Sequence, residues 1–65
     1  MRLIRLKAVL DRTGLSRSVI YALMADGQFP RPAKAYSGAR TNYWVEGEVD
    51  DWVAARVADR ETEAA

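Results

Sequence analysis

Apolar side chains near the start of the chain recur at the spacing of an amphipathic helix. Leu6, Val9 and Leu10 follow one another at positions i, i+3 and i+4, which places them on one helical face. Gly14 comes shortly after this stripe, and glycine often ends a helix because it adopts the left-handed conformation at little cost. The pattern predicts a short helix over residues 7–13.

A second apolar stripe follows a three-residue connection. Val19, Ile20 and Leu23 repeat the helical spacing, and Ser16 precedes them as a good N-cap, which predicts a helix over residues 17–26. Two short helices joined by a turn that contains glycine form the helix-turn-helix pattern. Because ordinary helical hairpins use the same turn, the pattern alone leaves both interpretations open.

The next segment changes from helical to extended character. Pro30 and Pro32 exclude a continued helix, since each fixes φ and lacks a backbone donor. Residues 41–45 are rich in aromatic and β-branched types, and a Ser-Gly dipeptide ending at Gly38 favours a turn. We therefore predict a two-stranded hairpin that pairs residues 33–36 with residues 41–45.

The last apolar stripe includes Val49 and Trp52 and predicts a helix over residues 47–58, with acidic residues complementing its N-terminal dipole. Residues 59–65 lack an apolar anchor, so we expect a flexible acidic tail. The predicted fold is mainly α with a small β-hairpin, in the order of a winged helix-turn-helix. Residues 1–58 would form this domain.

Composition narrows the possible functions. A chain of 65 residues that is 49% apolar and 29% charged is typical of one small folded domain. The absence of Cys excludes disulfides and thiolate metal sites, and the absence of His excludes common zinc ligand sets and Ser-His catalytic pairs. We therefore predict no enzyme, no metal and no cofactor. No apolar run is long enough to span a membrane, and we expect a cytoplasmic protein.

Charge is distributed unevenly along the chain. Residues 1–45 carry eight Lys or Arg against two Asp, a formal +6, whereas residues 46–65 carry two Arg against seven acidic residues, a formal −5. Such asymmetry indicates that the basic part meets a polyanion, and duplex DNA is a strong candidate. The alternative is that both parts are simply solvated.

Polar residues outside the second apolar stripe are candidates for DNA contacts. Arg17, Ser18 and Tyr21 lie at the start of that helix, where a recognition helix presents side chains to base edges in the major groove. Arg17 can bridge guanine O6 and N7 or bind a phosphate, unless it is only a solvated arginine. Alternatively, Tyr21 packs against the predicted hairpin, which would form the wing of the fold. Ser16 is primarily a cap, with a phosphate contact as a secondary role.

The predicted hairpin supplies further cations. Lys34 and Arg40 flank its turn, where a wing can place a cation in the adjacent minor groove or on its phosphates. Arg31, which two prolines hold extended, is a third candidate for a backbone contact. Trp44 and Trp52 could stack on bases, but a domain of this size needs their apolar area, so we assign them to the core.

Three stretches of the sequence share a pattern with a known family. They are Arg5–Lys7, Thr13–Ser18 with Ile20 and Tyr21, and Gly27–Pro32 with Arg40, Trp44, Glu48, Val49 and Trp52. Over about residues 3–57 the chain resembles the AlpA family of phage and prophage regulators. The resemblance implies a MerR-like winged helix-turn-helix, related to phage excisionases, that binds DNA without a cofactor as a transcriptional regulator or recombination directionality factor.

These observations predict a sequence-specific double-stranded DNA-binding protein. Residues 17–26 would enter the major groove, and residues 33–45 would lie on the adjacent minor groove. Copies of the protein would associate cooperatively on DNA, the acidic helix of one copy meeting the basic wing of the next. The alternative function is a protein-interaction module whose acidic C-terminal helix docks a basic partner such as an integrase or a polymerase subunit.

Overall fold

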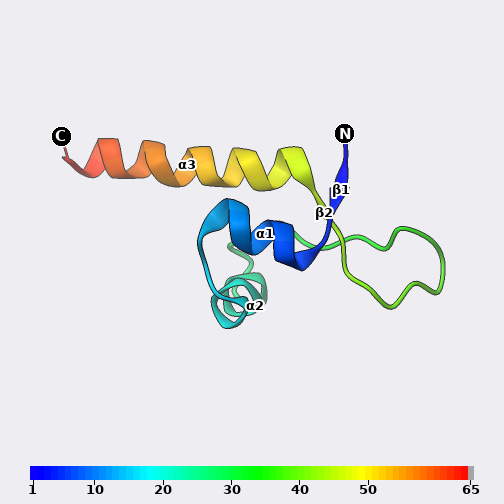
Figure 1. Ribbon diagram of the computed structural model, residues 1–65. Coiled ribbons are helices and arrows are strands. Elements are labelled where there is room, and N and C mark those ends of the chain that lie inside the picture. The colour runs from blue at the N-terminus through cyan, green and yellow to red at the C-terminus, as the bar shows by residue number, and fades with distance from the viewer. Residues whose placement is uncertain (65) are drawn as a thin grey trace.

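The computed structural model describes residues 1–64, with side chains for residues 1–60, and is mostly helical (Figure 1). Its elements are β1 (Leu3–Ile4), α1 (Leu6–Thr13), α2 (Arg17–Ala25), β2 (Trp44–Val45) and α3 (Glu46–Ala64). Within this part of the chain, three helices combine with one antiparallel strand pair. The predicted fold class, a small winged helix-turn-helix, is confirmed.

The turn between α1 and α2 forms as the sequence predicts. Gly14 adopts φ 71° and donates its N–H to the carbonyl of Leu10, which ends α1. Ser16 is the N-cap of α2, since its Oγ accepts the N–H of Val19 at 3.3 Å. Each helix differs from the prediction at one end by one residue. α1 begins at Leu6 instead of residue 7, and α2 ends at Ala25, with Asp26 as its C-cap.

The sheet differs from the predicted hairpin. β1 pairs with β2 in the register Leu3↔Val45 and Ile4↔Trp44, whereas residues 33–36 form no strand. A two-residue strand is too short to show an alternating pattern, and no local turn connects it to its partner. The sequence therefore gave no signal for β1.

The wing is the segment of residues 33–43, and one bridge closes its base. Ala33 and Tyr43 exchange backbone hydrogen bonds of 2.6 and 3.0 Å, and the ladder stops there. Beyond Ala33 the chain bends into a turn in which the N–H of Ala39 donates to the carbonyl of Tyr36 at 3.1 Å. The predicted hairpin over residues 33–36 and 41–45 is thus mainly a loop, because this turn takes residues 34–36 out of pairing distance.

The core lies where the two strands meet the three helices. It consists of Ile4, Val9, Ile20, Phe29, Trp44 and Val49. Trp52 is partly buried, meets Phe29 edge-on with ring centroids 4.9 Å apart, and donates its Nε1–H to the carbonyl of Gln28 at 2.7 Å. The prediction that both tryptophans serve the core is confirmed, with Trp44 fully buried.

Helix α3 is longer than predicted and projects beyond the rest of the molecule (Figure 1). It continues through Ala64 instead of ending at residue 58, and Arg56 forms an i,i+3 ion pair with Asp59 at 2.8 Å. The prediction ended the helix at its last apolar anchor, but Ala, Arg and Glu are strong helix formers without one. Residue 65 of the predicted tail lies outside the described residues.

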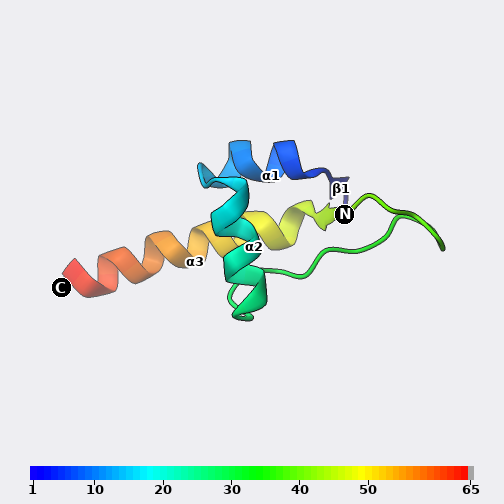
Figure 2. The same ribbon diagram turned by 90° about the horizontal axis from the view of Figure 1, so that it is seen from below.

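The helices pack in a crossed arrangement. α1 packs against α3, and α2, which starts near the end of α1, crosses α3 when the molecule is viewed from below (Figure 2). The wing extends from the end of the body opposite the C-terminus (Figure 1). None of the helices within residues 1–64 combines the length and the apolar character needed to cross a bilayer.

Candidate nucleic-acid interface

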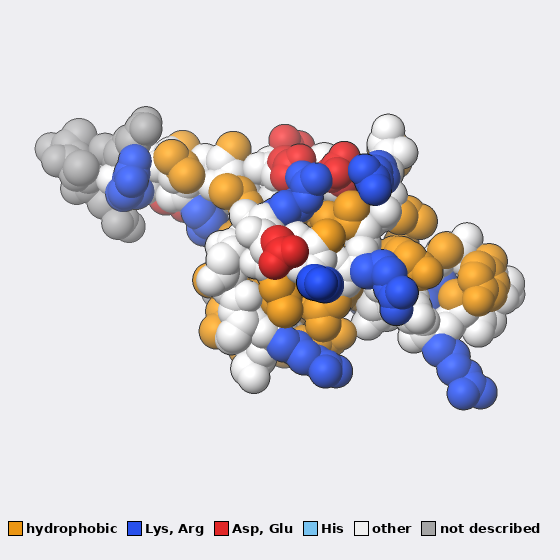
Figure 3. All heavy atoms as spheres, viewed as in Figure 1, with side chains coloured by type: hydrophobic (Ala, Val, Ile, Leu, Met, Phe, Trp, Pro, Cys, Tyr) orange, Lys and Arg blue, Asp and Glu red, His pale blue; other side chains and the backbone are white. Residues whose placement is uncertain are grey.

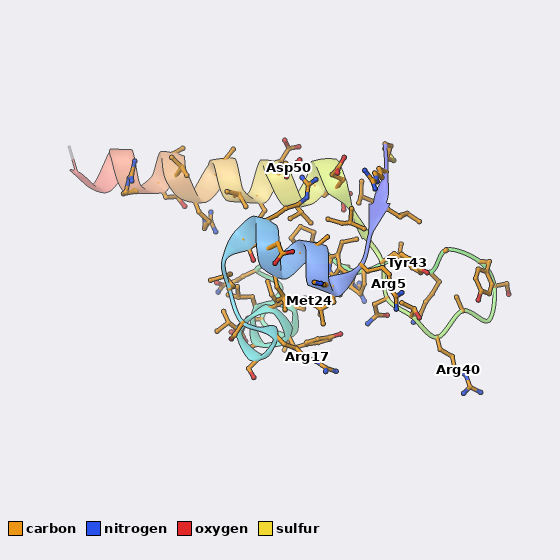
Figure 4. All side chains as sticks on the ribbon, viewed as in Figure 1. Arg5, Arg17, Met24, Arg40, Tyr43 and Asp50 are labelled. Atoms are coloured by element: carbon orange, nitrogen blue, oxygen red, sulfur yellow. The ribbon has the colours of Figure 1, made fainter. Side chains whose placement is uncertain are left out.

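The first turns of α2 present polar side chains to solvent. Arg17, Ser18 and Tyr21 are all exposed, Tyr21 with 37% of its surface accessible. The Arg17 guanidinium carbon lies 5.7 Å from the centroid of the Tyr21 ring, a cation–π contact that limits the freedom of the arginine. Figure 4 shows Arg17 directed away from the body of the protein. The three predicted residues thus share one outward edge of α2.

The wing holds its two cations in different ways. Lys34 donates its Nζ protons to Asn42 Oδ1 at 2.8 Å and to the carbonyl of Arg40 at 3.3 Å, so it bridges the two arms of the loop. Arg40 is exposed, and its side chain extends outward on the same side as Arg17 (Figure 4). Arg31 is exposed between Pro30 and Pro32, on the segment that leads from α2 into the wing.

A cleft separates α2 from the wing. Its volume is about 530 Å³, and it is lined by Arg5, Leu6, Lys7, Tyr21, Arg40, Thr41, Asn42 and Trp44. The cleft therefore joins the start of α1 to the two elements predicted to meet DNA. Neither Arg5 nor Lys7 was among the predicted site residues.

A signal for these two residues was present in the sequence. Helices usually carry acidic residues in their first turn, where they complement the partial positive charge of the N-terminus. The first turn of α1 has no acidic residue, and its N-cap, Arg5, makes no side-chain capping bond. Basic residues at a helix start do not complement the helix dipole, and both Arg5 and Lys7 are exposed there.

Where α1 faces α3, Arg12 is paired with two carboxylates of α3. Arg12 Nη1 lies 2.8 and 3.0 Å from the two carboxylate oxygens of Asp50, and Nη2 lies 2.6 Å from Glu46 Oε2. The hydrogen bond to Asp50, with smaller contributions from the charges of Asp50 and Glu46, raises the pKa of Arg12 above its ordinary value. In Figure 3, acidic side chains lie over α1 and the first turns of α3 together with basic ones, while the visible charged side chains of α2 and the wing are basic.

Together these features define a class of protein. A helix-turn-helix whose second helix exposes a positioned arginine, next to a loop that carries a second arginine on the same side, is a small winged helix-turn-helix with a basic face. The family model of the prophage CP4-57 regulatory protein (AlpA) matches residues 2–57. The chain belongs to this family, as the sequence resemblance predicted.

Two relatives illustrate the range of the similarity. The chain is 39% identical over 59 residues to the uncharacterized protein ORF88 of enterobacteria phage P4, a match that covers 91% of this chain and 65% of that protein. It is 34% identical over 62 residues to the DNA-binding transcriptional activator AlpA of Escherichia coli K12, with 86% of each chain covered. The chain thus spans slightly less than two thirds of the length of the phage P4 relative.

Proposed function

We propose that this protein is a sequence-specific regulator that binds double-stranded DNA and has no catalytic role. The observation that carries the proposal is the common orientation of Arg17 on α2 and Arg40 on the wing (Figure 4). The name of the E. coli relative, a DNA-binding transcriptional activator, supports it. A protein that acts on DNA works in the compartment that holds the DNA, so we also propose a cytoplasmic location.

The proposed complex places the N-terminal half of α2 in the major groove. Arg17 would donate two hydrogen bonds to guanine or one pair to a phosphate, already oriented by its contact with Tyr21. Ser18 and the hydroxyl of Tyr21 would add phosphate or base contacts. The free N–H groups that follow Ser16 would favour a phosphate at the helix start.

The wing would lie over the neighbouring minor groove. Arg40 would place its guanidinium on the groove or its phosphates, and Arg31 would reach the backbone from the segment between two prolines. Lys34 would contribute chiefly by keeping the loop closed, because its ammonium group already has two partners within the wing. Its positive charge would still add to the attraction of phosphate.

Among finer roles we favour transcriptional regulation over direction of recombination, because the E. coli relative is named as an activator. Docking of a basic integrase or polymerase subunit on the acidic side of α3 is less well supported. Glu46 and Asp50, two of the acidic residues there, are already engaged by Arg12. A single module of this size makes a DNA interface of only about 600–1,000 Å², so we also propose cooperative binding at paired sites.

Selection from a random duplex library, followed by footprinting on the recovered site, tests the proposal. If four to six basic residues contact phosphates, the logarithm of the affinity should fall with the logarithm of salt concentration at a slope of about −3.5 to −5.5. Arg40→Ala should weaken binding to all sequences alike. A flat salt response with no recovered site would reject DNA as the partner, and one isolated non-cooperative footprint would reject cooperative binding.

A further inference from the structure

We propose that the cleft between α1, α2 and the wing binds one phosphodiester of the DNA backbone through Arg5 and Lys7. This inference rests on the proposed function and adds a third contact region to α2 and the wing. The chemistry of the ligand is a phosphate oxyanion. Its proposed source is the duplex backbone, since the cleft lies between the two elements assigned to neighbouring grooves.

The cations around the cleft come from separate parts of the chain. Arg5 and Lys7 belong to the start of α1, and Arg40 belongs to the wing, yet all three line the same space. Each of the three is exposed, and the lining residues include no Asp or Glu. Like charges that converge on a concave surface repel one another, and a bound oxyanion reverses this repulsion through charge-assisted hydrogen bonds.

An unpaired donor in the wall of the cleft independently points to a ligand. Trp44 lines the cleft and is fully buried, and its indole Nε1–H has no hydrogen-bond acceptor among the described residues. Trp52 provides the contrast, because its Nε1–H is satisfied by the carbonyl of Gln28. Buried donors without a partner are uncommon, and under the proposal the bound phosphate is the acceptor that this donor lacks.

The position of the cleft fixes which phosphate it would bind. When α2 occupies the major groove and the wing lies on the adjacent minor groove, the backbone strand that divides the two grooves must pass between these elements. The cleft occupies that position, with Tyr21 of α2 on one side and Thr41 and Asn42 of the wing on the other. The contacted phosphate is therefore expected between the two footprints and not at the edge of the site.

The double variant Arg5→Ala/Lys7→Ala tests the two cations. Losing the contact with this one phosphate should make the salt slope shallower by about 0.9 and reduce the affinity by roughly tenfold at about 0.1 M salt, equally for selected and random duplex. The matched control is Arg60→Ala, which removes an exposed cation from the distal part of α3 and should leave the slope unchanged. An unchanged slope in the double variant would overturn the inference, while an unaltered operator preference would keep the proposed function intact.

Neutral methylphosphonates in the duplex test the same contact with the unmodified protein, so the result does not depend on a variant that folds. Substitution at one position between the α2 and wing footprints should weaken the wild-type protein and leave the double variant unaffected. Equal losses for both proteins at every position would contradict the inference. Failure of the wild-type protein to bind any duplex would instead reject the proposed function itself.

The two indole N–H groups give a spectroscopic readout of the cleft. On saturation with duplex, the Trp44 indole resonance should shift, whereas that of Trp52 should stay in place because its bond to Gln28 is unchanged. Inorganic phosphate alone is the second arm of the experiment. A Trp44 shift with millimolar phosphate but none with duplex would assign the cleft to a free anion and overturn the backbone assignment.

Discussion

Arg12 and Arg17 lie on adjacent helices, yet their surroundings differ completely. Arg12 on α1 faces α3 and forms hydrogen bonds with the carboxylates of Asp50 and Glu46. Arg17 on α2 lies over the ring of Tyr21 and extends into solvent (Figure 4). Arg12 is therefore paired with anions of the protein itself, whereas the charge of Arg17 is available to an external anion.

This difference corrects what the charge distribution along the sequence suggests. The formal +6 of residues 1–45 counts Arg12 and Lys34 together with the outward cations. In the fold, Arg12 is neutralised by α3, and Lys34 is bonded within the wing. The acidic C-terminal part is therefore in part the counter-charge of the basic part, and the outward cations of α2, the start of α1 and the wing are those that the proposal assigns to DNA.

The largest expected effect contrasts the two arginines directly. Arg17→Ala should weaken binding to the selected duplex by about 1–3 kcal/mol and relax preference at one base position. Arg12→Ala should instead leave DNA affinity nearly unchanged and slightly lower the melting temperature, because it removes the ion pairs between α1 and α3. Parallel titrations and thermal melts measure both variants. Equal losses of DNA affinity would show that the two sides do not differ in function.

Trp52→Phe tests the attachment of α3 to the segment that follows α2. The variant keeps an aromatic ring against Phe29 but loses the bond to the Gln28 carbonyl, so it should be destabilised by about 1–2 kcal/mol. Urea denaturation measures the change. DNA affinity well below the melting point should be preserved, and a large loss there would place Trp52 in the interface.

Ser16 can separate a capping role from a DNA contact. Ser16→Ala removes the acceptor for the N–H of Val19 and should cost about 1 kcal/mol of stability. Ser16→Asp should restore the cap, since aspartate accepts the same bond, but should weaken DNA binding through repulsion from phosphate. Restored stability with undiminished affinity would show that Ser16 is a cap that lies away from the backbone.

The smallest expected effect is a gain. Gly47 lies in the first turn of α3 without a positive φ, and an added Cβ would meet no atom within 4 Å. Gly47→Ala should therefore stabilise the protein by about 0.5–1 kcal/mol and leave DNA binding unchanged. The matched control, Gly27→Ala, should destabilise because Gly27 adopts φ 71°. Loss of affinity in the Gly47 variant would extend the functional surface onto α3.

Much of the helical architecture could be predicted because its signals are local. The apolar stripes, Gly14 as a terminator and Ser16 as a cap each act within a few residues, and all appear in the fold. β1 could not be found, since its partner β2 follows in the chain only after α1, α2 and the wing. Strand pairing at that separation has no local pattern.

The residues of the candidate site also divide into those with local sequence signals and those that depend on tertiary structure. Arg17, Ser18 and Tyr21 follow from helical geometry, because the residues off an apolar stripe face solvent. The internal bonds of Lys34 depend on the closed shape of the wing, and the convergence of Arg5 and Lys7 with Arg40 depends on tertiary packing. Sequence patterns describe one helix or strand at a time, so they could not predict these contacts between elements.

The direct passage from β2 into α3 has a mechanical consequence. Val45 ends the strand and Glu46 begins the helix with no residue between them, and the N–H of Glu46 is bonded to the carbonyl of Arg2 at 2.7 Å. The strand and the helix therefore have no flexible residue between them, so the base of the wing and the start of α3 keep a fixed relative orientation.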